Sequence, residues 1–568
     1  MPASISNNRL SDGDDDRLVR HRDPRLKSMV LCCALAAPVF LAIWLIKWFV
    51  TDDGPNHLYN AFILSKLAEG NAFFKSFYAA RGGLLPYTAT YKTLSALMWI
   101  GSPRFADRIM MTATSLGFAG SVLWLRWRVC GWTAMSVVAP FVFLLSFSKL
   151  WLYGLYGFLI GASLFVVALG MWWKWRENLT LARITVLAIL LVLNFFFHII
   201  SATVAVGATV ILAVTTPGTR TKKCVTQSLI AVLPTVLLIS GFMLLMRHSS
   251  GEGPQWTGLG DGWSPSGWIR YLQSADFISI SFKNTWGGIV SLPTDLPFDR
   301  TPAYSYGVLS PFHWFLAGTF LLILSTTGGR LNRQHLLKHH YRGWIVIVSL
   351  LLAAGILGPG GFGDGGFFRE RILLLGLAAM APLLRVRAER GRAARAASVL
   401  LTFGLIVQEA FVCDYALVSN QIAGDFMQAR SVVGSNRRIG LIVTDPRTHY
   451  LLNPVPEIVN QLGLETDGIV WNNYGPAYYY VPITFRDDVE RDHWHTMDAL
   501  NKAIISGQPD AIRNGSTEAW RDAVSRVMND TDFLIVWGPA TGLDSLISEQ
   551  FDSQPCFERK SLSLFKHR

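Results

Sequence analysis

The sequence predicts a polytopic α-helical membrane protein with about eleven transmembrane helices, followed by a small C-terminal α/β domain. Of the 568 residues, 51% are hydrophobic and only 16% are charged, which is too apolar for a soluble chain of several domains. Apolar runs long enough to cross a hydrocarbon core of about 30 Å recur up to residue 413 and then stop. The more polar remainder, 414–568, is long enough for one soluble domain.

The N-terminus predicts a cytoplasmic tail and a first span that is retained. Residues 1–28 are polar and lack the periodicity needed to bury a core, so we expect a disordered tail. The apolar run 29–50 is longer than the h-region of a signal peptide and carries no small-residue cleavage site. It should therefore cross the membrane and place Thr51 on the outer face.

Clusters of Lys and Arg between the apolar runs predict the orientation, because cytoplasmic loops are enriched in both residues. These clusters are at 126–128, 174–183, 219–223, 328–342 and 385–395. Placing a helix between successive loops gives spans near 29–50, 109–125, 133–148, 152–173, 182–197, 200–215, 227–246, 307–325, 343–357, 371–385 and 396–413. The segment 85–101 must then be interfacial or re-entrant, because a further span there would reverse the orientation of every later span.

This topology predicts a transmembrane domain at 29–413 and an extracytoplasmic domain at 414–568. The outer loops of the first are 51–108, 247–306 and 358–371. In the second, short apolar runs predict buried strands within 438–445 and 532–539, the spacing in 517–528 predicts a helix, and the chain end at 559–568 predicts an edge strand.

Charge and cysteine content exclude several classes of protein. The net charge of +12 lies mostly in the short loops, so membrane topology explains it and no nucleic-acid partner is expected. The six cysteines are scattered without CxxC or Cys/His metal spacing. The glycines show no dinucleotide-binding fingerprint, so no nucleotide cofactor is expected.

The stretch TDDGPNH directly after the first span carries the main functional signal. Asp52 and Asp53 lie at the membrane boundary, where an unpaired carboxylate has no folding advantage over a neutral residue. In one interpretation the two acids only serve to cap the next helix, with Asp53 or Asn56 accepting from its free N–H groups. In the other, one of them is a carboxylate base in an outward-facing cavity, with the second Asp and His57 tuning it or helping to hold a divalent cation. The sequence does not decide which Asp is the base.

A first transmembrane helix followed at once by an acidic motif resembles the GT-C class of integral membrane glycosyltransferases. That class includes protein O-mannosyltransferases, aminoarabinose transferases and mycobacterial arabinosyltransferases. The Asp52-Asp53 pair is similar to the Asp-Asp of the arabinosyltransferases, although the adjoining PNHLYNAF is not their sequence. The resemblance implies a polyprenyl-phosphate-linked sugar donor and a catalytic Asp in the first outer loop.

Four basic residues on the predicted outer side are candidates for binding substrate. Arg369 and Arg371 begin a helix after a Gly-rich loop and would hold the donor phosphate, unless they only anchor the interface or pair with nearby acids. His198 follows NFFF in a tight turn and could instead be a packing residue, and Lys149 could be a snorkelling side chain. Aromatic residues in 247–306 and 471–485 either contact substrate or pack at the interface.

The leading hypothesis is a multi-pass inner-membrane glycosyltransferase that moves a sugar from a polyprenyl-phosphate donor to a glycan, lipid or protein acceptor on the outer face. A transporter or flippase for lipid-linked saccharides would need no base, and would be expected to show repeats and charges in mid-helix. A polysaccharide polymerase or ligase is the third alternative. The sugar, the acceptor and the need for a metal stay open.

Overall fold

The computed structural model describes residues 24–131, 135–215, 221–249, 256–257, 311–327, 341–359, 361–362, 366–384, 391–445, 452–486, 488–505 and 518–568. Most of the predicted N-terminal tail, nearly all of the aromatic outer loop 247–306 and most of the basic loops at 328–342 and 385–395 lie outside these residues.

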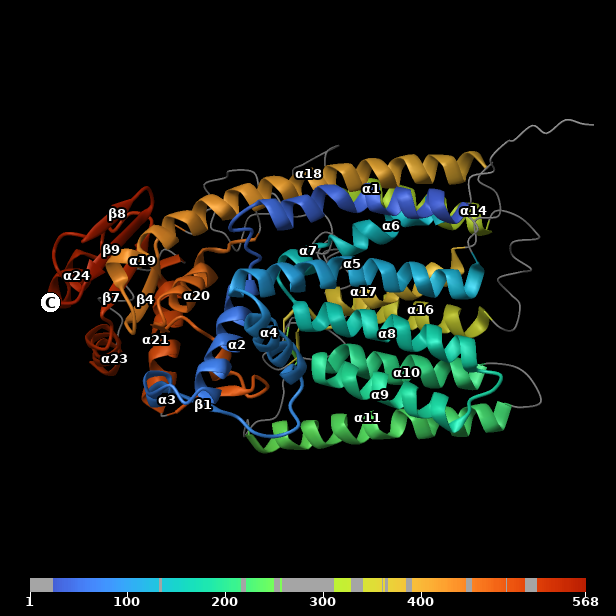
Figure 1. Ribbon diagram of the computed structural model, residues 1–568, viewed down its shortest axis with the longest axis horizontal. Coiled ribbons are helices and arrows are strands. Elements are labelled where there is room, and N and C mark those ends of the chain that lie inside the picture. The colour runs from blue at the N-terminus through green and yellow to red at the C-terminus, as the bar shows by residue number, and fades with distance from the viewer. Residues whose placement is uncertain are drawn as a thin grey trace, which may run out of the picture.

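Long helices lie side by side with their axes along the longest dimension of the molecule (Figure 1). One helix corresponds to each predicted span: α1 (Pro24–Leu45), α5 (Pro103–Cys130), α6 (Met135–Ser146), α8 (Tyr156–Trp175), α9 (Leu181–Phe197), α10 (Ile199–Thr215), α11 (Thr221–Ser249), α14 (Pro311–Thr327), α16 (Arg342–Leu357), α17 (Phe368–Met380) and α18 (Arg392–Gln428). Among the described residues, five stretches are long and apolar enough to cross a membrane, and four shorter apolar helices accompany them. The predicted polytopic helical fold is confirmed.

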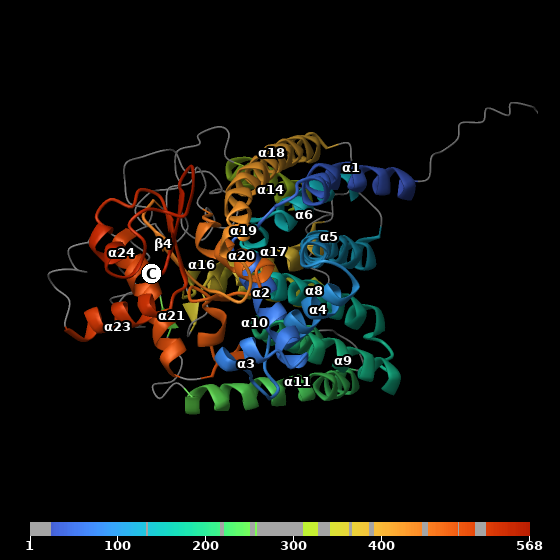
Figure 2. The same cartoon turned by 60° about the vertical axis from the view of Figure 1, so that its left-hand side comes forward.

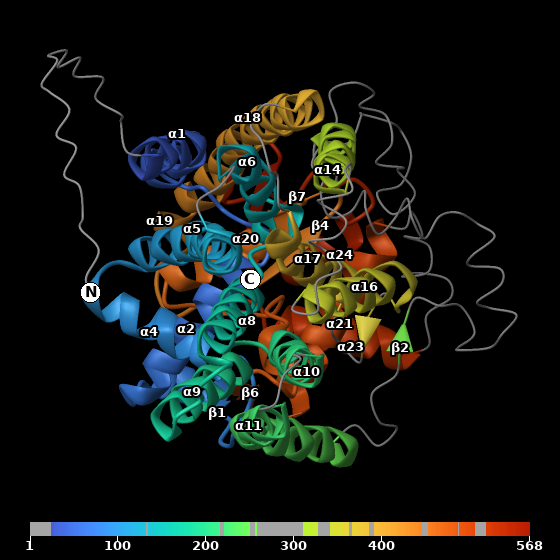
Figure 3. The ribbon, with the colours of Figure 1, turned by 90° about the vertical axis from the view of Figure 1, so that its right-hand side faces the viewer.

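The helices pack closely where small residues allow it, and they expose apolar side chains on the outside. Gly170 of α8 lies against Trp124 of α5, and a Cβ at this glycine would come within 2.2 Å of the indole ring. Close approach at small residues is the usual way for helices to associate in lipid. On α11, Leu237 and Leu244 are about 60% exposed, as expected of side chains that face lipid. Figure 3 shows the bundle nearly end-on, with α11, α18 and α1 at its periphery.

The C-terminal residues form a five-stranded sheet in the order β5-β4-β7-β9-β8. Its strands are β4 (Arg438–Val443), β5 (Ile469–Val470), β7 (Phe533–Trp537), β8 (Phe557–Arg559) and β9 (Leu562–Lys566). Strand β4 is parallel to β5 and β7, whereas β9 is antiparallel to its neighbours β7 and β8. The helices of this region are α20 (Val455–Glu465), α21 (Asp488–Ile505), α23 (Glu518–Asn529) and α24 (Asp544–Gln550). Both predicted strands and the predicted helix are present. The chain end, predicted as an edge strand, is instead internal, because the preceding β8 folds back on it as a hairpin.

The sheet lies beyond one end of the helix bundle, which we call the sheet end; the opposite end is the far end (Figures 1 and 2). Helix α18 continues past the expected end of the last span at 413 and reaches the sheet region at Gln428. Strand β1 (Tyr78–Ala80) pairs antiparallel with β6 (Ile483–Phe485) and ties the first loop to the C-terminal region. The Tyr59 hydroxyl donates to the Gly468 carbonyl at 2.6 Å, so the two regions are joined by buried polar contacts.

Helix α4 (Thr88–Ile100) covers most of the segment 85–101 that was expected to be interfacial or re-entrant. It packs against α2 (Gly54–Ala68), α5 and α9 near the sheet end. At about 1.5 Å per residue its 13 residues are too short to cross the hydrocarbon core. The segment is therefore helical without being a further candidate span.

Candidate functional site

The segment that carries the two aspartates is fixed by backbone hydrogen bonds to the end of the short helix α7 (Lys149–Leu152), just before α8. The N–H groups of Asp52 and Asp53 donate to the carbonyls of Leu152 and Tyr153 at 2.9 and 2.8 Å. This close approach of the two backbones requires a glycine in the segment that follows Leu152 and Tyr153. At Gly154, φ is +76° and a Cβ would lie 2.6 Å from the Thr51 hydroxyl oxygen. The pairing sets the direction in which each aspartate side chain leaves the backbone.

Helix α2 begins directly after Asp53, but the Asp53 carboxylate does not cap it. The residue has helical backbone angles at the N-cap position and makes no side-chain capping hydrogen bond. Asn56, the other expected cap, instead donates to Asn473 at 3.0 Å and accepts from Asn60 at 2.6 Å. The capping interpretation therefore does not explain why an aspartate occupies position 53.

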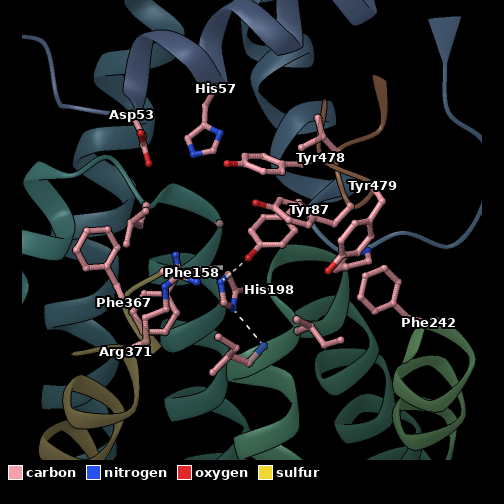
Figure 4. Close-up of a pocket in the computed structure, with 18 of the residues that line it drawn as sticks. Asp53, His57, Tyr87, Phe158, His198, Phe242, Phe367, Arg371, Tyr478 and Tyr479 are labelled. Carbon is pink, nitrogen blue, oxygen red and sulfur yellow. Dashed lines mark hydrogen bonds between the residues drawn. The ribbon is translucent and has the colours of Figure 1, made fainter. Parts of the chain in front are cut away.

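A cavity of about 310 Å³ lies at the sheet end, between the helices and the segment 474–481. Figure 4 shows the Asp53 and His57 side chains on one side of it, and Arg371, His198 and Tyr87 on the opposite side. Its lining comes from α2, α4, α8, the α9–α10 junction, the end of α11, the start of α17 and the segment 474–481. Of the predicted site residues, Asp53, His57, His198 and Arg371 are thus brought together from distant parts of the sequence.

The basic side of the cavity centres on Arg371. This side chain is only 7% exposed, and its Nε atom has no hydrogen-bond partner among the described residues. The guanidinium carbon lies 5.7 Å from the centre of the Phe158 ring, and the guanidinium approaches the Tyr87 hydroxyl as a donor. A buried cation with an unused donor is suited to hold an anionic group of a ligand.

His198 and Tyr87 form a hydrogen-bonded pair beside this arginine. The backbone N–H of Ile200 donates to Nδ1 of His198 at 3.2 Å, so in the neutral ring the proton is on Nε2. Nε2 lies 2.8 Å from the Tyr87 hydroxyl and donates to its oxygen. With its oxygen accepting from His198, the Tyr87 hydroxyl can donate its own proton into the cavity.

The acidic side of the cavity holds Asp53 and His57. Burial raises the pKa of Asp53 to about 6, although a hydrogen bond from Tyr474 and the charge of Arg371 oppose the shift. Burial and Arg371 lower the pKa of His57 to about 4, so this ring is neutral at pH 7. The His57 Nδ1 atom lies 3.1 Å from the Tyr91 hydroxyl. A carboxylate with a pKa near 6 is ionised at neutral pH and basic enough to accept a proton.

The remaining predicted site residues do not line the cavity. Asp52 is near Lys149, whose charge opposes the rise in the pKa of Asp52 that burial and Asp53 cause. Lys149 is 7% exposed and its ammonium lies 5.1 Å from the Tyr153 ring centre, so it does not snorkel to water. Arg369 is equally buried and is absent from the cavity wall.

Sequence reasoning missed the tyrosines of the site. Tyr87 and Tyr91 come from the segment treated only as a topological problem, and Tyr474 lies in the aromatic stretch 471–485 whose role was left open. A backbone signal accompanies two of the lining residues. Tyr87 and Phe367 have φ values of 67° and 58°, a conformation uncommon for residues with side chains and often found at functional sites.

The described residues contain no group of three or more His, Cys, Asp and Glu side chains arranged to hold a metal ion. Asp52, Asp53 and His57, the residues considered for a cation, thus do not form such a group.

Comparisons with known proteins were made by family model, by sequence and by structure. No family model and no curated protein matches the sequence. Among solved structures, the chain is similar to the crystal structure of ArnT from Cupriavidus metallidurans in the apo state, with 11% sequence identity and a TM-score of 0.43, over 95% of this chain and 98% of the other. This likeness concerns the fold alone and says nothing about the residues of the site.

Proposed function

We propose that the protein is a membrane glycosyltransferase of the GT-C kind that transfers a sugar from a polyprenyl-phosphate donor. One observation carries the proposal: at the end of a membrane helix bundle, an aspartate with a pKa near 6 and a buried, incompletely bonded arginine face each other across one cavity. Transfer from a lipid phosphate needs a base for the acceptor and a cation for the leaving group.

The donor phosphate would bind at Arg371, with the Tyr87 hydroxyl as a second donor. In another part of the lining, Phe242, Met243 and Met246 of α11 give the cavity an apolar wall. Other faces of α11 are exposed apolar surface, so a polyprenyl chain can pass from the bilayer along this helix. A ligand with an anionic head and an apolar chain fits both parts of this surface.

Asp53 would act as the general base. As the acceptor hydroxyl attacks the anomeric carbon, its proton passes to the Asp53 carboxylate, and the bond from that carbon to the phosphate oxygen breaks. The phosphate leaves with the bonding electrons, and its negative charge is stabilised by Arg371 and Tyr87. A single displacement of this kind inverts the anomeric configuration. Asp52, which does not line the cavity, would tune Asp53 and help to fix the segment.

We further propose that the sheet end faces the outside of the inner membrane. Arg104, Arg108, Arg369 and Arg371 belong to helix ends at the sheet end, whereas more of the described Lys and Arg residues belong to helix ends at the far end: Arg126, Arg128, Lys174, Arg176, Arg183, Lys222, Lys223, Arg392 and Arg395. Cytoplasmic loops carry this excess, so the far end would be cytoplasmic.

The proposal is tested by sugar transfer in nanodiscs. Purified wild type is incubated with a panel of radiolabelled polyprenyl-phosphate sugars, and both transfer and release of free sugar by water are measured. We expect one donor to be consumed by wild type and by Asp492→Asn, an exposed aspartate on α21, but about 100-fold more slowly by Asp53→Asn. Wild type that consumes no donor would refute the proposal and favour a transporter.

A further inference from the structure

A second cavity of about 270 Å³ lies beside the first, in the C-terminal region. It is formed between β4, the start of α20 and one face of α21. Tyr474 and Tyr478 belong to the walls of both cavities. The two spaces are therefore neighbours that share a wall of two aromatic side chains.

We propose that this second cavity binds a sugar ring of the acceptor and presents one of its hydroxyls to Asp53 past Tyr474. This inference rests on the proposed function and adds the acceptor's chemical class and position to it. The acceptor would approach from the C-terminal region, while the donor occupies the side of the first cavity that is formed by the helix bundle.

The lining offers the two kinds of group that recognise sugars. Trp494 and Tyr478 are both half-buried with ring centres 6.1 Å apart, and aromatic faces of this kind pack on the C–H face of a sugar ring. Glu457 and the ion pair between Lys502 and Asp498, whose Nζ and Oδ2 atoms lie 2.6 Å apart, add polar groups that can bond to hydroxyls. The cavity volume of about 270 Å³ is close to the lower end of the range for small-ligand sites, about 300 Å³.

Two other polar residues in the lining serve the fold instead. Asn472 accepts from the Leu441 N–H at 2.8 Å and donates to the Leu441 carbonyl at 3.0 Å. Asn501 accepts from the Val443 N–H at 2.7 Å and donates to the Leu441 carbonyl at 2.9 Å. Their amides complete the bonding of β4, so ligand recognition falls to Trp494, Tyr478 and the charged groups.

The position of Tyr474 connects the cavity to the proposed base. Its hydroxyl hydrogen-bonds to the Asp53 carboxylate, and Glu457 lies close enough to affect both residues electrostatically. Glu457 accepts from Asn460 at 2.8 Å through one carboxylate oxygen, Oε2. An acceptor hydroxyl that takes the place of the Tyr474 hydroxyl would meet Asp53 directly.

The test is saturation-transfer NMR on the full protein in nanodiscs with methyl glycosides of glucose, mannose, galactose and arabinose as probes. We expect at least one glycoside to give a signal with wild type and with Trp520→Ala, a tryptophan on α23 outside both cavities. With Trp494→Ala, binding of that glycoside should weaken about tenfold. Glu457→Gln should weaken it as well without lowering the melting temperature.

Donor hydrolysis separates this inference from the proposed function. Release of free sugar by water needs the first cavity only, so hydrolysis by wild type and by Trp520→Ala, whose side chain lines neither cavity, reports on the proposed function. If hydrolysis occurs but no glycoside distinguishes Trp494→Ala from wild type, the acceptor site is refuted and the proposed function stands. A wild type that neither hydrolyses nor transfers any donor refutes the proposed function instead.

Discussion

Replacing Asp53 by Asn should stabilise the protein and inactivate it. The Asp53 carboxylate is half-buried, and burial moves its pKa from 3.8 to about 6. The folded state therefore binds a proton more tightly than the unfolded state does, so ionisation at neutral pH works against folding. An Asn at this position is neutral and can still accept a hydrogen bond from Tyr474.

The size of the effect can be worked out from the shift in pKa. A change from 3.8 to about 6 corresponds to about 3 kcal/mol of unfolding free energy once the group is fully ionised, and partial exposure of the side chain to solvent makes this an upper value. Below about pH 4 the carboxyl is protonated in both states and contributes no penalty. The advantage of Asp53→Asn over wild type should thus appear between about pH 4 and pH 6 and stay constant above pH 7.

The assay is thermal unfolding of both proteins in nanodiscs at pH 4.5 and pH 8, together with donor consumption. At pH 8 we expect Asp53→Asn to melt a few degrees above wild type while reacting about 100-fold more slowly. The wild-type rate should rise with pH through about 6 and then level off. Asp492→Asn, at an exposed site, should change neither quantity. If Asp53→Asn melts below wild type at pH 8, the ionised Asp53 carboxylate does not destabilise the fold. If it reacts at the wild-type rate, Asp53 is not the general base.

Three further variants test the rest of the site. Arg371→Lys should raise the KM for donor about tenfold or more, because an ammonium cannot replace two guanidinium hydrogen bonds. Arg369→Lys, away from the cavity wall, should raise this KM much less. Equal effects of the two variants would contradict the placement of the phosphate at Arg371. Tyr87→Phe should lower the single-turnover rate about tenfold and weaken donor binding by less, because the hydroxyl's hydrogen bond strengthens as charge builds up on the leaving phosphate. An unchanged rate would remove the Tyr87 hydroxyl from the mechanism. Gly154→Ala should destabilise the protein by about 1–3 kcal/mol, because its φ is +76° and its Cβ would meet atoms of Thr51 and Gly54. Gly207→Ala, whose Cβ would meet no other atom within 4 Å, should be neutral or stabilising. Matching melting curves for the two variants would refute the close approach at Gly154.

The helix bundle was predictable from the sequence because a membrane span depends on local properties: a sufficient length of apolar residues and basic flanks. A different local signal, a short apolar run bounded by polar or turn residues, predicted the strands β4 and β7. The prediction that the chain end is an edge strand was wrong, because β8 pairs with β9 on its outer side. The sequence of one segment does not show which strands will pair with it. Likewise, α18 extends past 413 into the sheet region, and the fall in hydropathy there did not mark the end of the helix.

For the site, the sequence alone identified the acidic pair after the first span and the basic residue at the start of α17, because charges at a membrane boundary are costly and stand out. Only the tertiary structure decided that Asp53 and not Asp52 lines the cavity, since their directions are set by hydrogen bonds to residues a hundred positions away. It also brought Tyr87 and Tyr474 to the site from opposite ends of the chain. Such convergence depends on how helices and loops pack against one another, and hydrophobic periodicity carries no information on which partners they meet.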